Sequence, residues 1–197
     1  MQPDPAQVYP PAEDTFLLLT TARLEIRPDD RVLEVGTGSG TVAADLDKRV
    51  RCLVTTEINP HATVLAQKKG IAVVRTDLLD GVRGPFDLIL FNPPYLPTQP
   101  EERMGDWLEY ALDGGVSGRD TIGRFLTDVG RVLAPEGRIL FLLSSLTGLP
   151  GVISMARDRG YLTEIVREQA VEDERLYVLR LTRPDDRSIP GTVTRAE

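Results

Sequence analysis

The sequence contains a single cysteine and a single histidine among its 197 residues. With Cys52 alone, an internal disulfide and a cysteine-based metal cluster are both excluded, and its apolar neighbours predict a buried strand position. His61 follows Asn59 and Pro60, where we expect a helix to begin, so it is predicted to be a surface residue. No metal site is predicted.

The sequence also lacks a basic N-terminal region followed by an apolar stretch. No apolar run approaches the roughly 20 residues that are needed to cross a bilayer. We therefore expect neither a secretion signal nor a membrane partner, and we predict a cytoplasmic protein.

Positive charge is scarce. Acidic residues number 30 against 23 basic ones, the lysines are Lys48, Lys68 and Lys69, and the net charge is -7. Such a chain has no broad attraction to a phosphate backbone, which argues against nucleic acid as the substrate. A halophilic host would also explain the acidity, and the charge would then say less about the substrate.

Length and apolar content, at 41%, indicate one domain over residues 1–183, with a leading segment 1–11 and a disordered tail 184–197. Helices are predicted over 13–24, 41–48, 60–69, 119–133 (stopped by Pro135) and 152–158. Strands are predicted over 31–36, 51–57, 71–76, 86–91, 138–143, 161–166 and 175–181. This alternation predicts an α/β fold, with a mostly parallel sheet of about seven strands, helices on both faces and a C-terminal antiparallel strand pair.

A glycine-rich turn joins the first predicted strand to the following helix, in residues 33–40 (LEVGTGSG). Gly36 and Gly38 in such a turn adopt positive φ angles at little cost and let the backbone approach a ligand closely. Taken alone, the turn is also compatible with a dinucleotide enzyme or with a purely structural role.

Three carboxylates accompany this turn. Glu34 lies beside it, where its charge would repel a pyrophosphate but tolerate the ammonium and sulfonium groups of S-adenosylmethionine. Glu57 ends the second strand, where it could accept hydrogen bonds from ribose hydroxyls, and Asp77 ends the third, where it could accept from an adenine amino group. Strand termination or helix capping remains the alternative for Glu57 and Asp77.

The motif Asn92-Pro-Pro-Tyr95 follows the fourth predicted strand, at the edge where open parallel sheets carry their sites. A planar NH2 group could donate one hydrogen to the Asn92 side chain and one to the Pro93 carbonyl, and stack on Tyr95. These hydrogen bonds return electron density to a weak nitrogen nucleophile, so methyl transfer to nitrogen is favoured and no strong base is required. A rigid loop without chemistry is the alternative.

A long irregular connection follows over residues 96–118, and such connections are more often functional than decorative. Trp107, Tyr110 and the glycine-rich residues 113–119 could close over a substrate. Anchoring of the loop to the core is an equal alternative for Trp107.

Residues 8–19 (VYPPAEDTFLLL), 33–40 (LEVGTGSG) and 92–95 (NPPY) together resemble the HemK-like family of release-factor glutamine methyltransferases. The chain is most similar to its short archaeal and eukaryotic branch, over about residues 9–181. This resemblance implies a Rossmann-like class I fold and S-adenosylmethionine as cofactor.

The resemblance also implies roles for individual residues. The cofactor would be bound by Thr15, Glu34, Gly36, Gly38, Glu57, Asp77, Leu78 and Asn92. The acceptor would be held by Asn92 and Pro93, with Tyr95 beside them, and would be the glutamine of the Gly-Gly-Gln loop of a class I peptide chain release factor, methylated at N5. The branch works as a heterodimer with a small zinc-binding activator, which we expect to pair with an edge strand at residues 71–76.

Other functions remain open at this point. N6-adenine or other amino-group methylation of nucleic acid presents the same planar NH2 group to the motif, and a small-molecule acceptor is equally compatible with it. A scaffold protein that binds the cofactor without catalysis is the alternative outside the enzymes.

Overall fold

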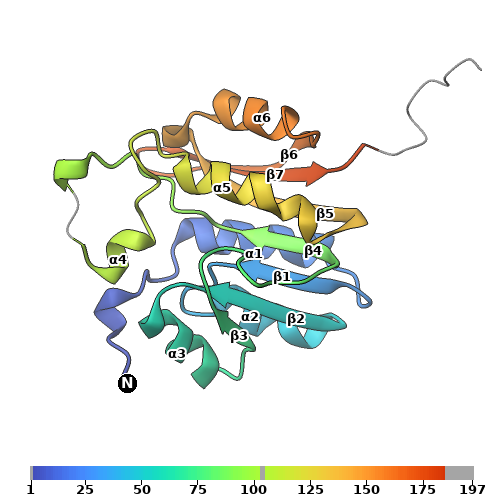
Figure 1. Ribbon diagram of the computed structural model, residues 1–197, viewed down its shortest axis with the longest axis horizontal. Helices are drawn as coiled ribbons and strands as arrows, with labels where there is room; N and C mark the ends of the chain where they lie inside the picture. The colour runs from blue at the N-terminus through green and yellow to red at the C-terminus, as the bar shows by residue number, and fades with distance from the viewer. Residues whose placement is uncertain (1, 103–104, 185–197) are drawn as a thin grey trace, which may run out of the picture.

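The structure is a computed structural model that describes residues 2–102 and 105–184 (Figure 1). The helices are α1 Glu13–Glu25, α2 Thr41–Leu46, α3 Pro60–Lys68, α4 Trp107–Tyr110, α5 Asp120–Asp128 and α6 Leu149–Arg157. The strands are β1 Arg31–Val35, β2 Cys52–Glu57, β3 Val73–Arg75, β4 Phe86–Phe91, β5 Leu133–Ser144, β6 Leu162–Ala170 and β7 Arg175–Thr182. The predicted disordered tail lies outside the described residues from 185 onward, and the prediction of one domain over 1–183 stays a prediction.

The strands form one seven-stranded sheet in the order β3-β2-β1-β4-β5-β7-β6. Neighbouring strands from β3 to β5 pair in parallel, whereas β7 lies antiparallel between β5 and β6. The predicted α/β fold is therefore confirmed, including its C-terminal antiparallel pair. Strand β3 lies at one edge of the sheet, as the methyltransferase strand order predicts, but it is shorter than the predicted span 71–76.

Two apolar layers cover the sheet, and β4 shows why. Ile89 and Phe91 belong to the core cluster beneath α5 and α6, whereas Leu88 and Leu90 belong to the cluster beneath α1, α2 and α3. Successive side chains of a strand point to opposite faces, so an uninterrupted apolar strand must be buried on both. Figure 1 shows α5 in front of the sheet and α1 and α2 behind it.

Two local predictions are wrong. Cys52 is exposed, because it is the first residue of β2 and lies at the end of the strand rather than in its buried middle. The helix predicted to run to residue 133 ends at Asp128, with a 3-10 turn at Val129–Arg131, and Pro135 lies inside β5. The pairing of β5 with β4 shifts register between Phe86 and Leu88, and a proline is tolerated at such an irregularity because no ladder N–H is required there.

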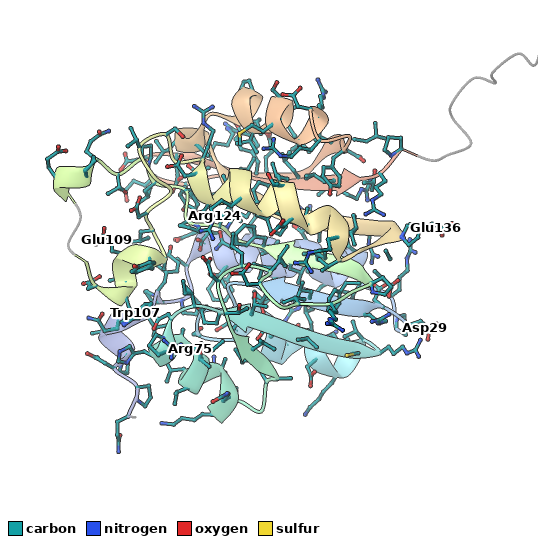
Figure 2. All side chains as sticks on the ribbon, viewed as in Figure 1. Asp29, Arg75, Trp107, Glu109, Arg124 and Glu136 are labelled. Atoms are coloured by element: carbon teal, nitrogen blue, oxygen red, sulfur yellow. The ribbon has the colours of Figure 1, made fainter. Side chains whose placement is uncertain are left out.

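The parallel arrangement brings the ends of β1, β2, β3 and β4 to one edge of the sheet, as expected for an open α/β fold. Figure 2 shows Trp107 and Arg124 on this side, whereas Asp29 and Glu136 mark the opposite end of the strands. Within residues 2–102 and 105–184, no helix is both long enough and apolar enough to cross a membrane.

Candidate active site

A cavity of about 490 Å³ lies at the carboxyl ends of the parallel strands. Its walls come from the loops after β1, β2, β3 and β4, from the leading segment before α1, and from the connection that contains α4. Every residue predicted for the site lines it: Thr15, Glu34, Gly36, Gly38, Glu57, Asp77, Leu78, Asn92, Pro93 and Tyr95. The structure therefore brings together residues that are up to 80 positions apart, Thr15 and Tyr95.

The glycine turn forms one wall of the cavity. Gly38 has a φ of 53°, donates its N–H to Glu57 Oε2 at 2.7 Å and has open space where a Cβ would stand. Gly40 has a φ of 75° and starts α2, and a Cβ there would lie 2.9 Å from the Cβ of Ala66 in α3. Glycine is therefore required at Gly40 both by the backbone angle and by the close packing of two helices.

Glu34 is a buried carboxyl group of the site whose pKa is strongly raised. It is 5% exposed, and its Oε2 accepts a hydrogen bond from the Thr37 hydroxyl at 2.7 Å. Burial raises the pKa of Glu34 to about 8, against the lowering effect of the Thr37 hydrogen bond. No ion pair to Glu34 occurs among the described residues, so a cationic ligand group at this wall would supply the missing partner.

Glu57 is held by the backbone on both sides. Its Oε2 accepts from Gly38 N and its Oε1 accepts from Asn59 N at 2.8 Å. Burial raises its pKa, while these backbone hydrogen bonds act in the opposite direction. A carboxylate has about four acceptor sites, and the backbone of Ile58 also interacts with this one, so Glu57 could still accept from a ligand hydroxyl.

Asp77 carries an interaction that sequence reasoning missed. Its Oδ2 pairs with Arg124 Nη2 of α5 at 2.5 Å, and both side chains are more than one-third exposed. The next residue, Leu78, has a φ of 46° and is the one non-glycine residue with positive φ in the described part of the chain. Such backbone strain in a non-glycine residue is concentrated at ligand sites.

The Asn92 side chain is hydrogen-bonded to α1 rather than to its own loop. Its Nδ2 donates to Asp14 Oδ2 at 2.9 Å, and Asp14 is 4% exposed. The amide oxygen Oδ1 is buried and has no hydrogen-bond partner among the residues that the structure describes. An unsatisfied buried acceptor is costly, and a ligand N–H would satisfy it.

Two tyrosines flank this pair. The Tyr9 hydroxyl is hydrogen-bonded to Asp14, and burial, together with the Asp14 charge, raises its pKa to about 12. Burial also raises the pKa of Tyr95, with smaller contributions from Asp14 and from Glu174, to which Tyr95 is hydrogen-bonded. The Tyr95 hydroxyl thus stays protonated near neutral pH and acts as a hydrogen-bond donor rather than as a base.

Sequence reasoning missed Asp14 and Glu174 as parts of the site. Asp14 lies in the first turn of α1, and the positive end of a helix is a common place for an acidic residue, so its type alone does not indicate a site. The available signal was its position among buried apolar residues on α1, with Leu17 and Leu18 one turn further on. Glu174 lies in the turn between β6 and β7, and only the antiparallel pairing with β5 brings it to the site.

The leading segment, residues 1–11, is hydrogen-bonded through Gln7 to the connection that contains α4. Gln7 Oε1 accepts from the backbone N–H of Trp107 at 3.0 Å, and the Gln7 carbonyl accepts from Asn59 Nδ2 at 2.7 Å. The rings of Trp107 and Tyr110 lie 5.2 Å apart, and both line the cavity. Trp107 is thus attached to the leading segment and contributes to the cavity wall.

Acids predominate among the charged residues that line this cavity: Asp14, Glu34, Glu57, Asp77, Glu109, Asp113 and Asp120, against Arg124. In the described residues, no group of three His, Cys, Asp or Glu side chains is placed to hold a metal ion. The arrangement suits a cationic ligand with hydroxyl and amino groups next to a second ligand that donates N–H hydrogen bonds.

Comparison with known proteins agrees with this geometry. Residues 13–105 match the family described as "Methyltransferase small domain". A protein of Methanocaldococcus jannaschii named as a protein N5-glutamine methyltransferase is 38% identical over 184 residues, which cover 90% of this chain and 92% of that protein. Methyltransferase HEMK2 of Homo sapiens is 33% identical, with 90% and 91% covered.

Among solved structures, the E. cuniculi Mtq2-Trm112 complex contains a similar chain. It has a TM-score of 0.77 and 27% identity, with 90% of this chain and 99% of that chain covered. The fold and the cavity define a class I methyltransferase, an enzyme that takes its methyl group from S-adenosylmethionine. Within that class, the chain belongs to the HemK-like family of protein glutamine methyltransferases.

Proposed function

We propose that this enzyme methylates the side-chain nitrogen, N5, of the glutamine in the Gly-Gly-Gln loop of a class I translation termination factor. The unsatisfied amide oxygen of Asn92 carries the proposal, because it offers a buried acceptor to an N–H donor beside the cofactor cavity. Relatives support this acceptor, since one is named for N5-glutamine methylation and the Mtq2-Trm112 complex is described as responsible for methylation of eRF1. The enzyme would act in the cytoplasm, where termination takes place.

The chain has residues that fit S-adenosylmethionine. In this proposal Glu34 faces the cationic end of the cofactor, Glu57 accepts from the ribose hydroxyls and Asp77 accepts from the adenine amino group. Thr15, Gly36, Gly38, Leu78 and Asn92 complete the wall. When bound, the cofactor supplies a methyl group that is already activated by its positive sulfur.

The acceptor side of the site then has two tasks. Asn92 Oδ1 and the Pro93 carbonyl accept hydrogen bonds from the NH2 group of the glutamine, which raises the electron density on a nitrogen weakened by amide resonance. Tyr95 limits the motion of the planar amide by stacking against it. Fixed geometry of this kind accounts for much of the rate enhancement expected at a site without a strong base.

A panel of acceptors tests the proposal. The purified protein, with isotopically labelled cofactor, is offered a termination factor, the same factor with its Gly-Gly-Gln glutamine changed to glutamate, DNA and RNA. We expect label in the unmodified factor alone. Label that enters nucleic acid and spares both protein acceptors would contradict the proposed substrate and favour an amino-group methyltransferase acting on bases.

We also propose that a small zinc-binding activator pairs with β3. This strand has one neighbour, β2, and its outer edge offers unpaired backbone groups on which a partner strand can be added. Val74 of β3 is 47% exposed, which is unusual for a valine in a sheet and suits an interface. The Mtq2-Trm112 complex supports a partner of this kind.

Two variants test this surface. Val74→Arg adds a charge at the edge, whereas Leu162→Arg does so on β6 at the opposite edge, where Leu162 is 56% exposed. We expect only Val74→Arg to abolish co-purification with the activator. An isolated chain that is soluble, monomeric and fully active would make the activator unnecessary.

A further inference from the structure

On the basis of the proposed function, we infer that Asp14 is a positioning residue that fixes the orientation of the Asn92 amide and thereby selects nitrogen over oxygen in the acceptor. Asp14 lies on α1, 78 residues before Asn92, so the contact depends on the fold rather than on the local loop. It joins the first helix of the chain to the motif after β4.

The direction of the hydrogen bond follows from chemistry. A carboxylate accepts hydrogen bonds and has none to donate, so the Asn92 atom that faces Asp14 must be its NH2 group. The distance from Asn92 Nδ2 to Asp14 Oδ2 is 2.9 Å, within the range of a charge-assisted hydrogen bond. The opposite atom, Oδ1, is thereby turned away from Asp14 and left as the free acceptor.

Asp14 is itself held in place. Its Oδ1 accepts from the backbone N–H of Thr15 at 2.5 Å and lies 3.2 Å from the Thr15 hydroxyl, and the carboxyl group also interacts with the Tyr9 hydroxyl. The side chain is almost completely buried. With both oxygens engaged, the carboxylate presents one fixed acceptor to Asn92, and an asparagine amide that would otherwise rotate has a single preferred orientation.

This orientation matters because the acceptor is itself an amide. Glutamine presents an NH2 group and an oxygen that are nearly equal in shape, so shape alone does not distinguish them. An outward oxygen on Asn92 attracts the NH2 group of glutamine and repels its carbonyl oxygen. If Asn92 were free to turn its own NH2 outward, the glutamine could bind in reverse with its oxygen toward the methyl donor. By orienting the Asn92 amide, Asp14 therefore favours nitrogen over oxygen as the methylated atom of the acceptor.

An exchange of the two side chains tests the inference. Asn92→Asp places two carboxylates together and removes the donor, so we expect kcat/KM for the termination factor to fall on the order of 100-fold. Adding Asp14→Asn restores a donor to the pair with the roles reversed, keeps the total charge of the native pair and leaves one oxygen of the new carboxylate at position 92 as the acceptor. We expect this double variant to regain at least about tenfold over Asn92→Asp alone.

A matched control removes the neighbouring charge. Glu13→Gln neutralises an exposed carboxylate at the same end of α1, and we expect unchanged kcat and KM. Cofactor affinity and melting temperature, measured for all variants, separate positioning from unfolding. A double variant no more active than Asn92→Asp, with cofactor binding intact, would overturn the inference.

A second measurement needs no acceptor. In 15N-labelled protein, the side-chain NH2 signal of Asn92 should lie in the range of a charge-assisted hydrogen bond and move to that of a free amide in Asp14→Ala. An identical Asn92 signal in both proteins would overturn the fixed orientation, whatever the substrate is. A changed signal in a protein that leaves the termination factor unmodified would support the orientation and refute the proposed substrate.

Discussion

Replacing Glu34 by glutamine should stabilise the free protein and weaken cofactor binding. Glu34 is 5% exposed, and burial raises its pKa to about 8 from an ordinary 4.5. The folded chain therefore holds this proton more tightly than the unfolded chain does. As pH rises from about 4.5 to about 8, the Glu34 carboxyl makes the free energy of unfolding smaller.

The magnitude follows from the two pKa values. At about 1.4 kcal/mol for each pH unit that separates them, ionisation of Glu34 opposes folding by about 4 kcal/mol at pH 8. Glutamine has nearly the same shape, still accepts the Thr37 hydrogen bond and carries no charge. The Glu34→Gln variant should thus match the native protein near pH 4.5 and exceed its unfolding free energy by up to about 4 kcal/mol at pH 8.

Two assays check this prediction. Urea unfolding at pH 5 and pH 8 measures the stability difference, and calorimetry measures cofactor affinity. Loss of the carboxylate that faces the cationic cofactor should weaken affinity at least about tenfold, equal to one charge-assisted hydrogen bond. Asp45→Asn removes a partly exposed carboxylate that is paired with Arg23; it serves as the control and should leave affinity unchanged. A Glu34→Gln variant with native affinity, or with no stability gain at pH 8, would refute the reasoning.

Four other variants have defined expectations. Gly40→Ala should destabilise the protein by about 1–3 kcal/mol in urea unfolding, because its Cβ would lie 2.9 Å from Ala66 and its φ is 75°. Gly70→Ala has a similar φ but open space around it, so it should lower the free energy of unfolding by less. Arg138→Met should cost about 3–5 kcal/mol, because it leaves Asp30, now paired at 2.7 Å and 4% exposed, as a buried charge. Arg124→Ala, which frees the exposed Asp77 carboxylate, should leave stability within about 1 kcal/mol, as expected for a surface ion pair, and a larger loss would contradict that assignment.

The sequence was most informative where one principle governed the outcome. Apolar runs such as Phe86–Phe91 have to be buried on both faces, so they predicted a covered parallel sheet. Because parallel strands share a carboxyl edge, residues from four loops could be assigned to one site from the sequence alone, and they line one cavity. All of the predicted site residues line it.

Sequence reasoning failed where contacts between distant parts of the chain determine the structure. The apolar neighbours of Cys52 predicted a buried residue, but Cys52 is the exposed first residue of β2. Pro135 looked like a helix stop, but a register shift in β5 accommodates it. The contact between Asp14 and Asn92 joins residues 78 positions apart and depends on how α1 packs on the sheet, which no local pattern encodes.

The most direct test of the central claim is mass spectrometry of a class I termination factor after incubation with this protein and S-adenosylmethionine. With the native protein, we predict one added methyl group, located on the glutamine of the Gly-Gly-Gln loop. With Asn92→Ala, which should still bind the cofactor, we predict an unmodified factor. A termination factor that stays unmodified with the native protein and any required activator, or equal methylation by both proteins, would contradict the account.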